Sequence, residues 1–262
     1  MTLTLIVLAT LAGGVLSVCI AAALTVGLLA RLVKHLVSLS AGVLLGTALL
    51  QVLPEAFHDH GEHHAEPQAL FITLLLGLLF FFLLEKFELY RHAHHHEGDG
   101  HHHHHHFDAE QAGRGGMAVL LGDSIHNFCD GVLIAAAFLT DVQLGVVTAV
   151  AVILHEIPQE VGDYIVLLNA GLSRARALAY NAISGLASVA GGVIGYFVVR
   201  PWEDLFPYLL VVAASSFIYV AVADLIPQLQ RRLPLRETGA QLAWLAAGLG
   251  LILAVSRGLG SH

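Results

Sequence analysis

The sequence predicts an all-α polytopic membrane protein with eight transmembrane helices and both termini on the extracytoplasmic side. Its 262 residues are 56% hydrophobic and 12% charged, whereas an average soluble protein has about 25% charged residues. The mean hydropathy is +0.75. This composition excludes a soluble enzyme and a disordered chain. The net charge of −8 excludes a nucleic-acid-binding protein, which would carry an excess of Lys and Arg.

Hydrophobic runs of membrane-spanning length define the individual helices. A bilayer core of about 30 Å requires about 20 apolar residues per helix, and helices satisfy their own backbone hydrogen bonds in lipid. We expect the first run to span, since no basic residue precedes it and it is longer than the apolar part of a signal peptide. The runs predict one transmembrane domain over residues 1–262, with helices over approximately 3–30, 36–57, 69–90, 116–139, 144–169, 174–199, 206–228 and 239–259.

Basic residues predict the orientation, because Lys and Arg near helix ends stay on the cytoplasmic side. Only Arg200 and Arg257 flank the even-numbered connections or the C-terminal end. The other ten basic residues flank the odd-numbered connections; they are Arg31, Lys34, Lys86, Arg91, Arg114, Arg174, Arg176, Arg231, Arg232 and Arg236. We therefore expect the connection 91–115 to lie in the cytoplasm.

That connection is rich in histidine and contains Glu, Asp and Gly residues that do not form a packed core. Low-complexity His tracts bind metals such as zinc, copper, nickel and iron with loose geometry. The alternatives are a solvated linker or an internal affinity tag. The histidines expected to bind metal are His94, His95, His96, His101, His102 and His103.

A second group of metal-binding side chains follows the second predicted helix on the extracytoplasmic side. It consists of His58, Asp59, His60, Glu62, His63 and His64, and no basic residue lies among them. Together with Glu55 in the last turn of that helix, His58 and His60 are expected to gather metal at the entrance of a transport path. An ordinary solvated acidic surface is the alternative.

Polar side chains form one stripe on each of the fourth and fifth predicted helices. At 100° per residue each stripe covers a restricted arc of an otherwise apolar helix. The middle of each stripe falls near the middle of its span, so the two stripes are expected to meet near the bilayer midplane. They contain Asp123, His126, Asn127 and Asp130 in the fourth helix, and His155, Glu156, Gln159, Glu160 and Asp163 in the fifth.

The energetic penalty of these groups predicts a metal site. A central acid raises the free energy of insertion by about 2.5–3.5 kcal/mol, so five acids approach or exceed the roughly 5–15 kcal/mol stability of a domain. Interhelical hydrogen bonds would explain Asn127 or Gln159 alone, but not five carboxyl groups with two imidazoles. A divalent cation held by imidazole nitrogen and carboxylate oxygen compensates the charge, and zinc favours this donor set.

Two further features concern the path of the metal. Pro158 removes an amide donor and crowds the carbonyl group of Leu154, which could then help to coordinate metal; a simple kink is the alternative. Asp123, Glu160 and Asp163 fall on the cytoplasmic side of the midplane, roughly 5–10 Å from it at 1.5 Å per residue. We expect the metal to leave along these three acids.

The motifs of the fourth and fifth helices resemble the signature segments of the ZIP (Zrt-, Irt-like protein) metal transporters. They are Gly122–Gly131, G-D-S-I-H-N-F-C-D-G, and His155–Asp163, H-E-I-P-Q-E-V-G-D. The segments ending at Glu55 and Pro227 and the His-rich connection support the resemblance, which covers nearly the whole chain. The His-Glu-x-Pro motif resembles the branch that contains zinc transporters of animal endomembranes and plasma membranes.

The resemblance implies the eight-helix ZIP fold, a metal site between helices 4 and 5, and movement of divalent metal into the cytoplasm, usually by a homodimer. We expect zinc as the transported substrate, with iron, manganese and cadmium as further candidates. The expected location is the inner or plasma membrane, with an endomembrane as the alternative. The residues that match the family motifs are His126, Asn127, Asp130, His155, Glu156 and Glu160.

Two departures from the pattern weaken the expected nitrogen ligation. Gln159, retained in the predicted ligand set, stands where the branch commonly has histidine, and Gln51 stands where the second helix often has one. In the sixth helix no carboxylate accompanies the polar residues Asn181, Ser184 and Ser188. A two-metal centre is therefore not favoured.

Two other functions remain open. An intramembrane zinc hydrolase would usually carry His-Glu-x-x-His, and here the second imidazole is replaced by Gln159, although His126 could complete such a site. A metal-sensing receptor without flux would use the His clusters equally well. No phosphate-binding loop is present, so ATP is not expected to drive transport directly.

Overall fold

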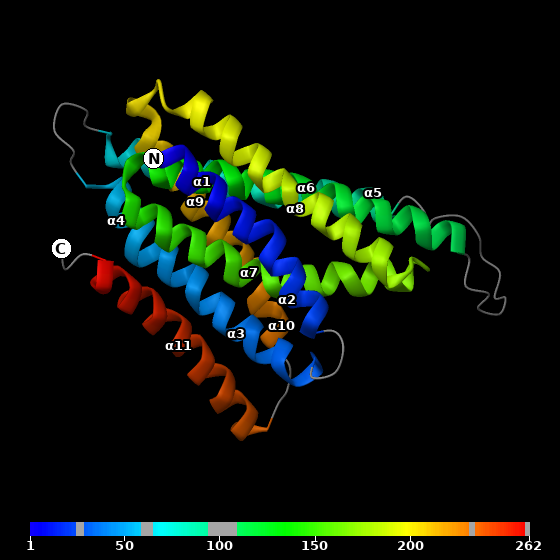
Figure 1. Cartoon of the computed structure of the whole chain (residues 1–262). Helices are drawn as coiled ribbons and strands as arrows, with labels where there is room; N and C mark the ends of the chain where they lie inside the picture. The colour runs from blue at the N-terminus through cyan, green and yellow to red at the C-terminus, as the bar shows by residue number, and fades with distance from the viewer. Residues whose placement is uncertain (25–28, 59–64, 94–108, 231–233, 260–262) are drawn as a thin grey trace.

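A computed structural model describes residues 1–24, 29–58, 65–93, 109–230 and 234–259. All regular secondary structure in these ranges is helical, as predicted for a polytopic membrane protein. Seven helical stretches are long and apolar enough to cross a membrane. The eighth, α6 (Ala109–Thr140), is 32 residues long; its polar stripe lowers its apolar content. The start of α1 and the end of α11 lie at one end of the bundle, opposite the end of α5 and the start of α6 (Figure 1).

Three of the spans are continuous helices interrupted by one wider, π-helical turn. The first consists of α1 (Thr2–Leu11), η1 (Ala12–Leu16) and α2 (Ser17–Leu24). The second consists of α3 (Leu29–Thr47), η2 (Ala48–Val52) and α4 (Leu53–Ala56), and the seventh of α9 (Phe206–Tyr219), η4 (Val220–Leu225) and α10 (Ile226–Leu229). The remaining spans are α5 (Pro67–Ala93), α6, α7 (Val142–Asn169), α8 (Arg174–Val199) and α11 (Leu235–Leu259), while η3 (Glu203–Leu205) is a short turn before α9.

Proline explains two of the wide turns. Pro54 follows η2 and Pro227 follows η4, each at the start of the next helical segment. Proline lacks the amide that would donate to the carbonyl four residues earlier, and a wider turn lets the helix continue past it. The sequence did not predict these turns, which lie on helices that border the central site.

Capping side chains and a glycine turn define the connections of α7 to α6 and α8. Asp141 caps α7, because its carboxylate accepts a hydrogen bond from the amide of Leu144 at 2.9 Å. At the other end Gly171 has a φ of 86°, a conformation that glycine adopts without strain. Ser173 then caps α8 through the amide of Arg176. These tight connections hold α6, α7 and α8 side by side.

Glycines bring pairs of helices into backbone contact. Gly14 of η1 lies against Gly185 of α8, and a Cβ on either residue would overlap the main chain of the other helix. Gly131 of α6 lies in the same way against the main chain of Ser188 in α8. Such small-residue contacts are the usual means of close packing between membrane helices. They fix the rotation of α6, which carries half of the polar residues of the site.

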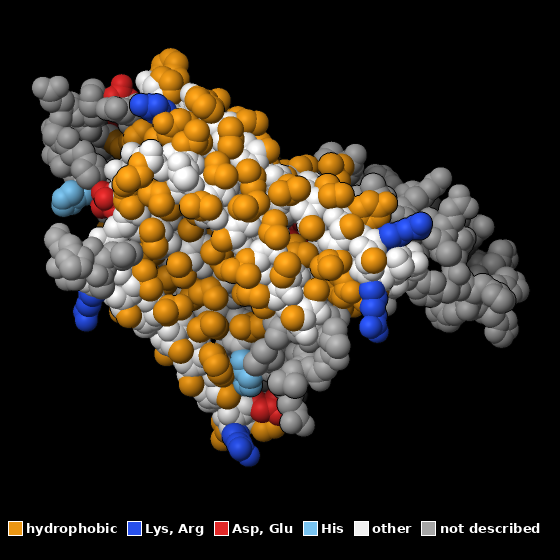
Figure 2. Space-filling model, viewed as in Figure 1, with side chains coloured by type: hydrophobic (Ala, Val, Ile, Leu, Met, Phe, Trp, Pro, Cys, Tyr) orange, Lys and Arg blue, Asp and Glu red, His pale blue; other side chains and the backbone are white. Residues whose placement is uncertain are grey.

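The outer surface is apolar, as expected for a protein surrounded by lipid. Figure 2 shows hydrophobic side chains over most of the visible face, with Lys and Arg near its edges. Only 17% of the apolar part of α5 and 11% of that of α11 is buried within the chain. Large side chains such as Phe71 and Leu83 are about 60% exposed on α5. These two helices therefore offer the lipid most of their surface.

Candidate metal centre

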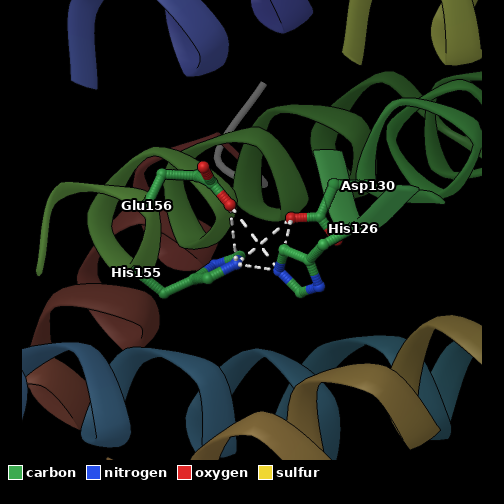
Figure 3. A group of neighbouring side chains, drawn as sticks. All are labelled: His126, Asp130, His155 and Glu156. Carbon is green, nitrogen blue, oxygen red and sulfur yellow. Dashed lines mark hydrogen bonds and ion pairs between the residues drawn. The ribbon is translucent and has the colours of Figure 1, made fainter. Parts of the chain in front are cut away.

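The polar stripes of α6 and α7 face each other inside the bundle. Figure 3 shows His126 and Asp130 of α6 pointing towards His155 and Glu156 of α7. Asp130, His155 and Glu156 are at most 2% exposed, and His126 is 14% exposed. One nitrogen or carboxylate oxygen from each of the four residues lies within 4.8 Å of the others. We call these four residues the His/carboxylate site.

The distances within this site match a tetrahedral zinc ion. The His155 Nε2 lies 3.1 Å from Asp130 Oδ2 and 3.3 Å from Glu156 Oε1. The His126 Nε2 lies 3.7 Å from the same Asp130 oxygen, 3.6 Å from the same Glu156 oxygen and 3.3 Å from His155 Nε2. Zinc bonds of 2.0–2.2 Å place tetrahedral ligand atoms about 3.3–3.6 Å apart. These five distances are therefore close to those expected between the ligand atoms of one tetrahedral zinc ion.

A main-chain hydrogen bond orients one of the imidazoles. The Nδ1 of His155 lies 3.1 Å from the carbonyl oxygen of Ala151, one turn earlier in α7. Because a carbonyl group only accepts, the proton belongs on Nδ1, which leaves the lone pair of Nε2 free for a metal. The ring also packs against Phe217 of α9, with 6.3 Å between ring centroids. The ligand nitrogen is thus held in position before metal binds.

The carbonyl group released by Pro158 is hydrogen-bonded to a neighbouring helix. Pro158 lies inside α7, and the carbonyl oxygen of Leu154 accepts a hydrogen bond from the Ser40 hydroxyl group. This hydrogen bond engages the carbonyl oxygen for which the sequence suggested metal coordination. The proline instead creates a contact between α7 and α3.

A second group of ligand atoms contains only carboxylates. It consists of Asp123, Glu156 and Glu160, all buried, with one oxygen of each within 4.8 Å of the others. Asp123 Oδ2 accepts a hydrogen bond from Ser184 at 2.5 Å, and Asp123 Oδ1 accepts one from Gln159 Nε2 at 3.3 Å. We call Asp123, Glu156 and Glu160 the carboxylate group.

Two of the residues expected as ligands, Gln159 and Asn127, carry neutral amide side chains. Gln159 donates a hydrogen bond from its Nε2 atom to Asp123 Oδ1. Asn127 is buried, and its Nδ2 has no hydrogen-bond partner among the described residues. Gln51 is also used elsewhere, because its Oε1 accepts a hydrogen bond from Ser256 at 3.0 Å.

A cavity of about 300 Å³ adjoins the His/carboxylate site. His126, Asp123 and Gln159 line it together with Asp163, which was expected on the exit path. Asp224 of η4 and Tyr219 of α9 also line it, and sequence reasoning assigned neither of them. The available signal was a carboxylate three residues before Pro227 in an apolar helix. Three carboxylates, of Asp123, Asp163 and Asp224, and the imidazole of His126 therefore line the same cavity.

The residues expected at the entrance and in the His-rich connection are less completely described. Glu55 lies in α4, and His58 is exposed just after it; both are outside the two groups of ligand atoms. His60 lies outside the described residues. So do the loop histidines His94, His95, His96, His101, His102 and His103.

Comparison with known proteins gives one consistent result. A family model described as the ZIP zinc transporter matches residues 1–111 and 88–256. Over 111 residues the chain is 43% identical to zinc transporter ZIP10 of Danio rerio, which covers 42% of this chain and 13% of that protein. Over 134 residues it is 38% identical to zinc transporter ZIP4 of Homo sapiens, covering 51% and 20% of the two chains. Over 139 residues it is 34% identical to zinc transporter foi of Drosophila melanogaster, covering 53% and 20%.

The matched regions span only 13–20% of these relatives' own lengths. The family match itself extends from residue 1 to residue 256 and includes every described helix that contributes to the site. The helical fold, the buried His/carboxylate site and this match agree, and the chain belongs to the ZIP zinc transporter family.

Proposed function

We propose that this protein carries zinc across the membrane into the cytoplasm by way of the His/carboxylate site. The observation that supports this most strongly is the set of two imidazole nitrogens and two carboxylate oxygens at tetrahedral spacing inside membrane-spanning helices. A buried ion of this kind needs partners that compensate its charge and its lost hydration. The relatives named above are zinc transporters.

Zinc is the preferred substrate of this donor set. Two imidazoles and two carboxylates provide four ligands, which zinc binds tetrahedrally. Iron and manganese also accept nitrogen and oxygen ligands, and cadmium accepts the same four atoms at longer distances. These metals are therefore secondary substrates in the proposal, and zinc selectivity depends on the two imidazoles.

The exit path in this proposal follows the acidic residues beside the site. Asp123 and Asp163 line the cavity that begins at His126, while Glu160 lies in the carboxylate group. The basic residues at the helix ends predict that this end of the path faces the cytoplasm. Glu55, His58 and His60 would gather metal at the opposite end, and the histidines of the connection 91–115 would receive it in the cytoplasm.

Transport requires that the site opens to one side of the membrane at a time. We include a homodimer in the cell membrane, with both chain ends outside the cytoplasm, in the proposal.

The hydrolase alternative receives no support: its second imidazole is replaced by Gln159, which is hydrogen-bonded to Asp123, and the family consists of transporters.

Zinc uptake into proteoliposomes tests the proposal. The wild-type protein should accumulate zinc in vesicles that contain a fluorescent zinc indicator, whereas His126→Ala and His155→Ala should abolish accumulation. Glu237→Gln, on the exposed first turn of α11, is the matched control and should transport normally. Equal flux through the well-inserted His155→Ala protein would refute the assignment, and zinc binding without flux would favour a sensor.

The exit path has a separate test. Replacing both Asp123 and Asp163 with Asn should reduce zinc flux while the His/carboxylate site still binds zinc. Unchanged flux in this double variant would exclude the path, but it would leave the zinc site itself untouched.

A further inference from the structure

Both carboxylate oxygens of Asp123 accept hydrogen bonds from neighbouring helices. The hydroxyl group of Ser184 in α8 donates to Oδ2 at 2.5 Å, and Nε2 of Gln159 in α7 donates to Oδ1 at 3.3 Å. Asp123 is 3% exposed and Ser184 is 2% exposed, so water does not compete freely for these bonds. The bond from Ser184 is the shorter of the two and has the length of a strong hydrogen bond to a charged oxygen. The carboxylate of α6 is therefore held from two sides, chiefly by α8.

The proton of the Ser184 hydroxyl group has one favoured acceptor. Ser184 Oγ also lies 2.9 Å from Ser124 Oγ and 3.3 Å from the carbonyl oxygen of Leu120. A hydroxyl group carries a single proton, and the carboxylate of Asp123 is both the nearest and the strongest acceptor. The carbonyl of Leu120 accepts from Ser124 instead, at 2.6 Å. The two serines thus have separate tasks, and that of Ser184 is directed at Asp123.

Asp123 lies between the His/carboxylate site and the cavity beside it. One of its oxygens is within 4.8 Å of an oxygen of Glu156, which belongs to that site. Asp123 also lines the cavity, as does His126. The hydrogen bonds that Ser184 makes with the described residues do not involve the four ligands of the site. Ser184 therefore acts on the passage from the site to the cavity without contacting the site itself.

We propose that Ser184 is a positioning residue, which orients the Asp123 carboxylate to receive the metal ion as it leaves the His/carboxylate site. The inference rests on the proposed zinc transport and its acidic exit path. A carboxylate that is already oriented needs no reorganisation when the ion arrives, and such preorganisation lowers the barrier of a step that moves charge. Ser184 should therefore affect the rate of zinc transport and leave the zinc affinity of the His/carboxylate site unchanged.

The neutrality of the donor suits this task. A hydroxyl group orients the carboxylate but leaves its negative charge available to a passing cation. Lys or Arg in the place of Ser184 would compensate that charge and repel the ion. A serine therefore combines a fixed carboxylate with an attractive one.

Zinc uptake by proteoliposomes, measured over a range of external zinc concentrations, tests the positioning role. Ser184→Ala should lower the maximal rate by about tenfold, as expected when a metal-binding group loses an outer hydrogen-bond partner. Isothermal titration in detergent should give the wild-type zinc affinity. Ser188→Ala is the matched control, because Ser188 lies one turn further along α8 and is 1% exposed. Its hydroxyl group has no hydrogen-bond partner among the described residues, so this variant should transport zinc normally.

A double-variant comparison shows whether Ser184 acts through Asp123. In the Asp123→Asn background the charge that Ser184 orients is absent, so adding Ser184→Ala should lower the rate no further. Additive effects of the two changes would overturn the positioning role. Normal uptake by Ser184→Ala beside an active wild type would also overturn it, and would leave the proposed zinc transport intact. Absence of uptake by the wild type would refute the transport function and this inference with it.

A second pair of variants keeps the test decisive if Ser184→Ala fails to fold. Ser184→Thr and Ser184→Val have nearly the same shape, but only threonine carries the hydroxyl donor. Ser184→Thr should transport zinc several-fold faster than Ser184→Val, while both bind zinc equally. Equal rates for this pair would show that the hydroxyl group of Ser184 does not orient Asp123 for transport.

Discussion

The hydroxyl oxygen of Ser40 lies 2.7 Å from the main-chain carbonyl oxygen of Leu154. Leu154 precedes the ligand His155, and its carbonyl is the one that Pro158 deprives of an intrahelical donor. A hydroxyl group from α3 thus replaces the missing amide within the membrane, where an unpaired carbonyl is strongly disfavoured. The contact joins the helix that carries His155 to a helix that contributes no ligand to the site.

We expect Ser40→Ala to destabilise the protein by about 1 kcal/mol, the usual net value of one buried hydrogen bond, or somewhat more because the Leu154 carbonyl is then unpaired. Thermal unfolding in detergent measures this change. Thr73→Ala is the control, since the Thr73 hydroxyl binds the carbonyl of Ala69 within its own helix. Equal melting temperatures for wild type and Ser40→Ala would mean that the Leu154 carbonyl does not need this donor.

Zinc should stabilise the folded protein measurably. A ligand that binds only the folded state adds about 2.7 kcal/mol at a concentration of 100 times its dissociation constant. We expect chelator-treated protein to unfold at a lower temperature and zinc to restore the transition. His155→Ala should abolish most of this response, because its Nε2 lies within 3.3 Å of both carboxylate ligands. An undiminished zinc response in His155→Ala would place the bound zinc elsewhere.

The sequence predicted the helical membrane fold because its apolar runs are long and charges are sparse. It also singled out all four residues of the His/carboxylate site, since His126, Asp130, His155 and Glu156 are conspicuous in apolar helices. The distances between them required the structure, because they depend on how α6 and α7 are rotated. The rotation of α6 is constrained by its packing against α8, which no periodicity within one helix can reveal.

Packing between helices also explains why the sequence did not reveal some residues of the site or placed them differently. Asp224 reaches the cavity from η4, a wide turn whose local geometry shifts the direction of its side chains. Gln159 donates to Asp123 because α6 lies beside it. Helical spacing placed Asn127 and Asp130 in one arc, but the 3.1 Å distance from Asp130 Oδ2 to His155 Nε2 required the structure.

Asp130 and Asn127 should therefore differ sharply in their importance for zinc binding. Asp130→Asn keeps the shape of the side chain but removes its charge, and we expect at least about a tenfold loss of zinc affinity. Asn127→Ala should change zinc affinity less, because a neutral amide compensates the charge of a buried cation less than a carboxylate does. Isothermal titration of purified protein with zinc measures both. A larger loss for Asn127→Ala than for Asp130→Asn would reverse the assignment.

The contact between α6 and α8 should control both stability and the site. In Gly131→Ala the new Cβ would overlap the carbonyl oxygen of Ser188 and the amide nitrogen of Gly192, which are main-chain atoms that cannot turn away. The two helices would have to separate, and overpacking of this kind typically destabilises a protein by about 1–3 kcal/mol. Because Gly131 follows Asp130 directly, we also expect weaker zinc binding.

Gly250→Ala is the matched control for this change. No atom lies within 4 Å of a Cβ at Gly250, which is exposed on α11, so the substitution should leave the melting temperature unchanged or raise it slightly. Thermal unfolding and zinc titration of the two variants separate packing from a general effect of replacing glycine in a helix. If Gly131→Ala unfolds and binds zinc like Gly250→Ala, the close approach of α6 and α8 does not orient the ligands, and their positions must be fixed by contacts of α7.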